Sequence, residues 1–188
     1  MKKLLILGLL TLGGCQSFTP TEPAPGMPAT VAAVDLERYL GTWFEQARLP
    51  IFFQDGDRVR CEDVTAIYTA RRDGAVDVLN TCRNALQGGA RRSATAVATP
   101  VPGSNNARLR VAFFWPFHGD YWIIGLDPEY RWAVVGAPSR RVLWILSRGT
   151  EMPPEDFDRA VEIARREGFA VQALQRTPQS PRVAAGGF

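Results

Sequence analysis

The amino-acid sequence predicts an all-β protein, namely an eight-stranded up-and-down antiparallel barrel with one C-terminal α-helix packed outside it. Three observations lead to this prediction: strand-like runs recur at steady spacing after residue 39, turn signals separate them, and one amphipathic segment follows the last run. Regular short strands in hairpin succession favour a closed barrel, and about eight strands leave room inside for one small ligand.

The N-terminal segment does not belong to the predicted barrel. Residues 1–14 combine the positively charged Met1-Lys2-Lys3 with an apolar core over residues 4–12. Such a core is too short to span a bilayer, so we interpret residues 1–14 as an export signal. Residues 15–34 hold several prolines among small and polar residues, which is typical of an extended tether.

The stretch Leu12-Gly13-Gly14-Cys15 resembles the bacterial lipobox, in which the cysteine is lipidated and becomes the first residue of the mature protein. The residue after this cysteine is Gln16. An aspartate at this position would resemble a signal for retention at the inner membrane, whereas Gln16 resembles a signal for sorting to the outer membrane. Acyl chains on Cys15 would anchor the protein to the bacterial outer membrane, on its periplasmic face, without crossing it. The alternative is a cysteine that follows an ordinary signal peptide by chance.

The length of the chain indicates one domain, and its charge pattern gives no indication of nucleic-acid binding. A chain of 188 residues with 46% hydrophobic residues suits one globular domain, which we place at residues 35–176. The formal net charge is +3, and Lys2 and Lys3 in the export signal account for part of it. Paired arginines elsewhere fall in turn-like contexts, which indicates solvated side chains, so nucleic acid is not an expected partner.

The first predicted strand covers residues 39–48, where side chains alternate with a period near two around Trp43. Gly41, which shortly precedes Trp43, would let the backbone bend tightly, as the start of a barrel strand requires. The alternative is an ordinary strand that carries a core tryptophan. The following loop, 49–57, has an apolar centre at Phe52 and Phe53. Such a loop either packs under itself or guards a binding site.

Seven further strands are predicted, at residues 61–69, 75–83, 90–98, 107–114, 121–127, 132–136 and 142–148. The strand at 121–127 has apolar residues on both faces, which indicates that its outer face is covered. An amphipathic helix that begins at Pro153 and ends near Gly168 supplies the cover, with one apolar stripe formed by Phe157, Ala160, Val161 and Ala164. A last strand is expected at 170–176 and a disordered tail at 177–188.

The cysteines support an exported protein. If Cys15 is lipidated, then Cys61 and Cys82 remain as a pair. They flank a predicted hairpin with its turn at Asp73-Gly74. Strands that run back from this turn place the two cysteines near each other, which predicts a disulfide. Two buried free thiols are the alternative.

Three motifs together resemble the lipocalin family. They are Gly41-Thr42-Trp43, Leu126-Asp127-Pro128-Glu129-Tyr130 and Leu143-Trp144-Ile145-Leu146-Ser147-Arg148, in the family's order and at plausible spacing. The likeness is strongest to the bacterial outer-membrane branch and to its animal relative, the apolipoprotein D branch. The commonest family pattern brings threonine, aspartate and tyrosine together in the second motif, whereas here Asp127 is separated from Tyr130, as in the bacterial branch.

The resemblance implies a set of site residues. It implies that the cavity is lined by Tyr68, Asn80, Phe113, Tyr121 and Trp144, with Phe52 and Phe53 at its entrance. It also implies that Arg148 stacks across Trp43 and closes the lower end of the barrel, a structural role. If Cys61 and Cys82 were directly opposed in a regular ladder, Tyr68 and Asn80 could not both face inward, and only a β-bulge would allow both.

The chemistry of the sequence favours binding over catalysis. His118 is the single histidine, and the sequence holds no serine-centred elbow, phosphate-cradling glycine loop or metal-spaced cysteine and histidine set. We therefore expect no enzyme, no metal and no cofactor. The expected function is a membrane-anchored protein that binds and carries or stores fatty acids or lysophospholipids. The alternatives are a carrier of another apolar ligand, such as haem, a pigment or a quinone, and a non-binding envelope scaffold.

Overall fold

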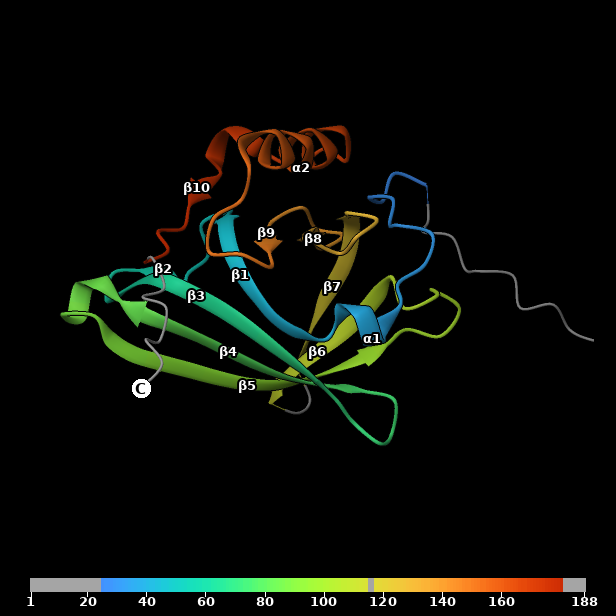
Figure 1. Cartoon of the computed structure of the whole chain (residues 1–188), viewed down its shortest axis with the longest axis horizontal. Coiled ribbons are helices and arrows are strands. Elements are labelled where there is room, and N and C mark those ends of the chain that lie inside the picture. Colours follow the sequence, from blue (N-terminus) through green and yellow to red (C-terminus); the bar gives the residue numbers. More distant parts are fainter. Residues whose placement is uncertain (1–24, 115–116, 181–188) are drawn as a thin grey trace, which may run out of the picture.

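The computed structural model describes residues 25–114 and 117–180, without the side chains of residues 113, 114 and 117. One antiparallel sheet of ten strands closes into a barrel because β1 (Gly41–Arg48) pairs with both β9 (Leu143–Ser147) and β3 (Val59–Ala70). The other barrel strands are β4 (Val76–Asn84), β5 (Ala90–Pro100), β6 (Arg108–Phe114), β7 (Phe117–Leu126) and β8 (Trp132–Gly136). The predicted eight-stranded antiparallel barrel is thus confirmed, with the two-residue strands β2 (Asp55–Gly56) and β10 (Gln175–Arg176) added to it (Figure 1).

The C-terminal helix α2 (Pro154–Arg166) lies outside the barrel, across β7, β8 and β9 (Figure 1). Its first turn carries acidic residues and its last turn carries Arg165 and Arg166, as the helix dipole favours. Ala160 and Ala164 are fully buried against the barrel. Close packing continues beyond the helix, where a Cβ on Gly136 would lie only 2.5 Å from Cζ of Phe169.

Strand β7 is apolar on both faces because each face has its own core. Ile123 belongs to the cluster inside the barrel, whereas Trp122 and Ile124 belong to the cluster between the barrel and α2. The covered outer face that the sequence predicts for residues 121–127 is therefore present. Trp132 also lies in the outer cluster, and its Nε1 is a buried donor that has no acceptor among the described residues.

One end of the barrel is closed by the short helix α1 (Leu36–Tyr39), which the sequence did not predict. The carboxylate of Asp35 caps it by accepting hydrogen bonds from the backbone of Glu37 and Arg38. Trp43 is fully buried behind α1, and its Nε1 donates to the carbonyl oxygen of Tyr39 at 2.8 Å. The guanidinium carbon of Arg148 lies 3.8 Å from the centroid of the Trp43 ring.

The chain on both sides of the predicted domain also packs on the barrel. Residues 25–34, which the sequence assigned to the tether, include Val31 and Val34, whose backbone N–H groups donate to Ile123 and Asn105. Residues 177–180, which it assigned to the tail, lie along β1 and β3. The export signal, Cys15 and residues 181–188 lie outside the described residues.

The predicted strand at 170–176 was too long. The chain turns between the end of α2 and β1, so residues Val171–Ala173 form the 3-10 turn η2 and only β10 pairs with β1. A second such turn, η1 (Ala85–Gln87), connects β4 and β5. In the described part of the chain, no helix has the length and apolar character needed to cross a bilayer.

A disulfide joins Cys61 in β3 to Cys82 in β4, as predicted. The two residues are not directly opposed, because the register pairs Cys61 with Asn84. A β-bulge between Glu62 and Thr65 shifts the rest of the ladder. The bulge includes Asp63, whose φ is 51°.

Replacing both Cys61 and Cys82 by alanine should lower the free energy of unfolding by about 3 kcal/mol, because the bond closes a loop in the unfolded chain. The sequence separation of 21 residues sets this size. Urea unfolding followed by tryptophan emission measures it. Reductant should shift the wild type toward the double variant and leave the double variant unchanged; equal midpoints for wild type and variant would contradict the prediction.

Candidate ligand-binding cavity

The barrel holds a cavity of about 920 Å³ with mostly apolar walls. This volume falls within the range of small-molecule sites in proteins, roughly 300–1,000 Å³. The closed end is the one that holds α1, Trp43 and Arg148. The mouth lies at the other end, where the loop between β1 and β3 meets η1 through hydrogen bonds of the Asn84 side chain to the backbone of Arg58 and Arg60.

Six of the seven residues predicted to line the site do line the cavity: Phe52, Phe53, Tyr68, Asn80, Tyr121 and Trp144. The side chain of the seventh, Phe113, lies outside the described part of the chain. Tyr68 and Asn80 both reach the cavity because the bulge at 62–65 changes the register, so that Ala66 rather than Thr65 is opposed to Asn80. The parity conflict in the sequence is resolved by this bulge.

Phe52 and Phe53 lie at the mouth. The side chain of Phe52 is 81% exposed and that of Phe53 is 42% exposed, although both line the cavity. Their rings contact each other edge to face, with centroids 5.4 Å apart. The loop therefore combines the two arrangements considered from the sequence: its aromatic rings pack on each other, and together they border the opening.

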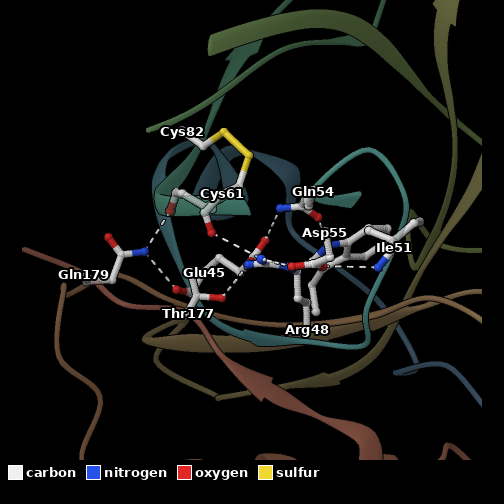
Figure 2. A network of polar contacts seen from close by, with 11 residues as sticks. Glu45, Arg48, Ile51, Gln54, Asp55, Cys61, Cys82, Thr177 and Gln179 are labelled. Carbon is white, nitrogen blue, oxygen red and sulfur yellow. Dashed lines mark hydrogen bonds and ion pairs between the residues drawn. A yellow bond between two sulfur atoms is a disulfide. The ribbon is translucent and has the colours of Figure 1, made fainter. Parts of the chain in front are cut away.

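A buried network of charged and polar side chains holds this loop in place (Figure 2). Arg48 at the end of β1 donates from Nε and Nη2 to the two carboxylate oxygens of Asp55, at 2.7 and 2.5 Å. Its Nη1 donates to Oε1 of Glu45 at 2.6 Å and to Oγ1 of Thr177 at 3.0 Å. Nη2 also reaches the carbonyl oxygen of Cys61 at 3.1 Å, so the guanidinium is fully paired.

Gln54 connects the network to the cavity. Its Nε2 donates to Oε2 of Glu45 at 2.8 Å, and its Oε1 accepts a hydrogen bond from Nε1 of Trp144 at 3.0 Å. Glu45, Gln54 and Trp144 all line the cavity. The rotamer of the predicted ligand-contacting Trp144 is therefore fixed by a buried ion pair that the ligand itself need not touch.

Burial and pairing move the pKa values of the network in different directions. Burial raises the pKa of Glu45, and the hydrogen bonds from Arg48, Thr177 and Gln54 oppose this shift. Burial also acts to raise the pKa of Asp55, but the paired hydrogen bonds from Arg48 bring it below its usual value. Against the effect of burial, the bonds to Asp55 and Glu45 raise the pKa of Arg48, which stays charged.

Alternation around Trp43 places Glu45 and Arg48 on opposite faces of the strand, so it does not predict that the two side chains form one buried ion pair; a β-bulge between Glu45 and Ala47 changes the register. Both side chains are buried because the C-terminal segment crosses them. The backbone N–H of Thr177 donates to the carbonyl oxygen of Gln46 at 3.0 Å, and Gln179 Nε2 donates to the carbonyl oxygens of Glu45 and Val64. Figure 2 shows Thr177 and Gln179 beside Glu45.

Three tyrosines meet at the closed end of the cavity. The hydroxyl of Tyr121 shares hydrogen bonds of 2.9 Å with the hydroxyls of both Tyr39 and Tyr68. Tyr39, the member that sequence reasoning missed, comes from α1. Burial raises the pKa values of Tyr39 and Tyr121 well above 10.0 and that of Tyr68 to about 12, so all three are protonated at neutral pH.

The described residues form no group of three or more histidine, cysteine, aspartate or glutamate side chains that could hold a metal ion. The site is thus an apolar cavity with an ion-paired mouth and a hydroxyl cluster at its base. Such an arrangement can hold a small apolar molecule that carries a polar end.

Comparisons with known proteins agree with this geometry. A family model described as a lipocalin-like domain matches residues 34–179. The chain is 42% identical over 158 residues to outer membrane lipoprotein Blc from Escherichia coli K12, covering 84% of each chain. It is 40% identical over 158 residues to temperature-induced lipocalin-1 from Arabidopsis thaliana, covering 80% of this chain and 82% of the relative. Apolipoprotein D from Bos taurus is more distant, at 28% identity over 77% of each chain.

A solved structure supports the fold. The crystal structure of the major allergen Per a 4 from cockroaches superposes with a TM-score of 0.61, covering 80% of this chain and 90% of that chain. The sequence identity is 18%, so this likeness concerns the architecture alone.

Asp55→Asn should lower the free energy of unfolding by about 2 kcal/mol at neutral pH, since hydrogen bonds between Arg48 and a charged partner are lost. Because the folded-state pKa of Asp55 is below 3.8, its stabilising contribution is complete above that pH and is lost as the pH falls through the folded-state pKa. The gap between wild type and variant should therefore close in acid. Urea unfolding between pH 7 and pH 2.5 measures the gap.

Asp57→Asn is the matched control, because Asp57 is an exposed aspartate two positions along the same loop. It should change stability little at any pH. A gap for Asp55→Asn that stays constant down to the lowest pH would contradict the assigned ion pair.

Proposed function

The chain belongs to the lipocalin family, which confirms the resemblance seen in its three motifs, and on this basis we propose that it binds and carries or stores fatty acids or lysophospholipids in the cell envelope. The family consists of binding proteins for small hydrophobic molecules, and the chain is not an enzyme. The observation that carries the proposal is the cavity of about 920 Å³ with its apolar walls and open mouth.

The cavity also bears on the alternatives. A scaffold barrel filled by its own side chains would leave no space of this size, so the non-binding alternative loses its main support. Haem, a pigment or a quinone would also be apolar enough to enter. Acyl chains are favoured because a relative that is 42% identical is named an outer membrane lipoprotein, and a membrane is the richest source of acyl chains.

Burial of an acyl chain accounts for tight binding only together with a polar contact. Burying about ten methylene groups contributes roughly 8 kcal/mol at about 0.8 kcal/mol each, and association costs at least about 4 kcal/mol. The remainder corresponds to only about millimolar binding. Tight binding therefore requires at least one further contact between the protein and the polar end of the ligand.

We further propose that acyl chains on Cys15 hold the protein on the periplasmic face of the outer membrane. The name of the bacterial relatives, outer membrane lipoprotein Blc, supports this location. Because residues 25–34 pack on the barrel, only the nine residues 16–24 lie between Cys15 and this packed segment, and the stretch from Cys15 to residue 25 can span at most about 35 Å. The folded domain would then stay close to the bilayer that supplies its ligand.

Trp144→Ala should weaken the binding of a long-chain fatty acid by about tenfold or more, since Trp144 borders the cavity and orients Gln54. The mature chain with Cys15→Ser, stripped of bound lipid, is titrated with palmitate and followed by calorimetry and tryptophan emission. Trp132→Phe is the control, because Trp132 lies outside the barrel and its Nε1 has no acceptor among the described residues. Absence of any palmitate binding by the wild type would refute the proposed function.

Cys15→Ser should release the protein from the membrane fraction into the soluble periplasmic fraction. In cells fed an alkyne-bearing palmitate analogue, the wild type should acquire the label and the variant should not. Cys61→Ala with Cys82→Ala should still be labelled, which shows that the label is specific to Cys15. A wild-type protein that stays unlabelled and soluble would contradict the anchor.

A further inference from the structure

The hydroxyl cluster at the closed end has a hydrogen-bonding capacity that the protein does not use. The hydroxyls of Tyr39, Tyr68 and Tyr121 carry three O–H hydrogens, and the two bonds among them use only two. No other side chain or backbone group of the described residues bonds to these hydroxyls. One hydrogen and several lone pairs therefore point into an otherwise apolar space, where an unpaired donor is costly.

The rings of the cluster are held rigidly, so the hydroxyls are already in place for a ligand. The Tyr39 and Tyr68 rings are stacked with centroids 5.8 Å apart, and the Tyr121 ring meets Tyr68 edge to face at 6.3 Å. Tyr39 also contacts the fully buried Trp43, with ring centroids 4.9 Å apart. Donors fixed in this way need little reordering when a ligand atom arrives.

The charge around the cluster is positive. Arg148 lies behind the cluster on the Trp43 ring, and its guanidinium donates only to backbone carbonyl oxygens, namely those of Arg38, Thr42 and Tyr130. It has no acidic partner within ion-pair distance among the described residues. A cation that is partly removed from water and lacks a counter-ion attracts an anion placed near it.

The buried carboxylate among the described lining residues lies toward the mouth. It is Glu45, which belongs to the network at the loop between β1 and β3, whereas Asp120, the other carboxylate of the described lining, is exposed. A ligand carboxylate near the mouth would face Glu45. Arg92 is a cation of the lining, but it is exposed, so water and salt screen its attraction.

We propose that the hydroxyls of Tyr39, Tyr68 and Tyr121 bind the carboxylate of a fatty acid that enters the barrel carboxylate first, with its methyl end toward the mouth. This inference rests on the proposed function and makes it more specific. A lysophospholipid cannot bind in this way, because the carboxyl group of its acyl chain is esterified and is not a free carboxylate. It would place only its methyl end at the cluster, so free fatty acids are the ligand class that the hydroxyls select.

Tyr68→Phe and Tyr121→Phe test the proposal, because each removes one hydroxyl and keeps the ring. The mature chain with Cys15→Ser, stripped of lipid, is titrated with palmitate and with palmitoyl-lysophosphatidylethanolamine, which has the same acyl chain. Each variant should bind palmitate about tenfold more weakly, as expected for the loss of a hydrogen bond to a charged group, and should bind the lysophospholipid within about twofold of wild type. Tyr130→Phe is the matched control, since Tyr130 lies at the same end but not in the cavity lining.

The outcomes separate the two proposals. If the variants bind both ligands as the wild type does, the orientation is overturned and the proposed function stands. If both ligands lose affinity equally, the hydroxyls maintain the shape of the barrel and do not recognise the carboxylate, which also overturns the proposal. If Arg92→Gln alone weakens palmitate binding, the carboxylate lies at the mouth. If the wild type binds neither ligand, the proposed function fails as well.

A second measurement needs no variant. Palmitate labelled with ¹³C at the carboxyl carbon, and separately at the terminal methyl carbon, is bound to the same protein and observed by NMR while a soluble gadolinium chelate is added. The carboxyl signal should broaden much less than the methyl signal, because the carboxylate lies at the closed end. The opposite order would overturn the proposal even if the tyrosine variants were unstable.

Discussion

The structure depends on how β1 closes the barrel. β1 pairs with β9 along one edge, but it pairs with β3 only from Gly41 to Phe44. Beyond Phe44 the two strands separate, and β10 takes the place of β3 beside Ala47 and Arg48. The gap in the ladder is filled by the Arg48 guanidinium and by residues 177–180, so the backbone groups there are satisfied by side chains and by a segment from the other end of the chain.

Two arginines therefore stabilise the two ends of the barrel in different ways. Arg148 at the closed end places its planar fork over Trp43 and donates to carbonyl oxygens, whereas Arg48 at the mouth donates to the carboxylates of Glu45 and Asp55. A lysine could not make either set of contacts, because both use the flat shape and several donors of guanidinium. Compared with apolar side chains of similar size, a buried ion pair adds little net stability, although removal of one partner alone is costly. Its main effect is to select one geometry for the loop at the mouth.

This division explains which features could be predicted from the sequence. The α2 stripe, the two-faced β7 and the Cys61–Cys82 pair follow from local periodicity and turn positions. The bulge at residues 62–65 and the burial of Glu45 could not be predicted from local periodicity and turn positions. A bulge is defined only relative to a partner strand, and Glu45 is covered by Thr177, which is far away in the sequence. Residues whose environment is built by distant segments carry no local signal.

The polar groups of the cavity differ in what they leave available to a ligand. At the mouth, the carboxylate of Glu45 and the amide of Gln54 already have partners within the protein, so a ligand group would have to displace them. At the closed end, the hydroxyl cluster keeps a donor free. An acyl chain gains similar free energy in any dry apolar cavity, because burial is not directional. Selectivity among amphipathic lipids therefore has to come from groups whose hydrogen bonds are incomplete without a ligand, and the hydroxyl cluster at the closed end is such a group.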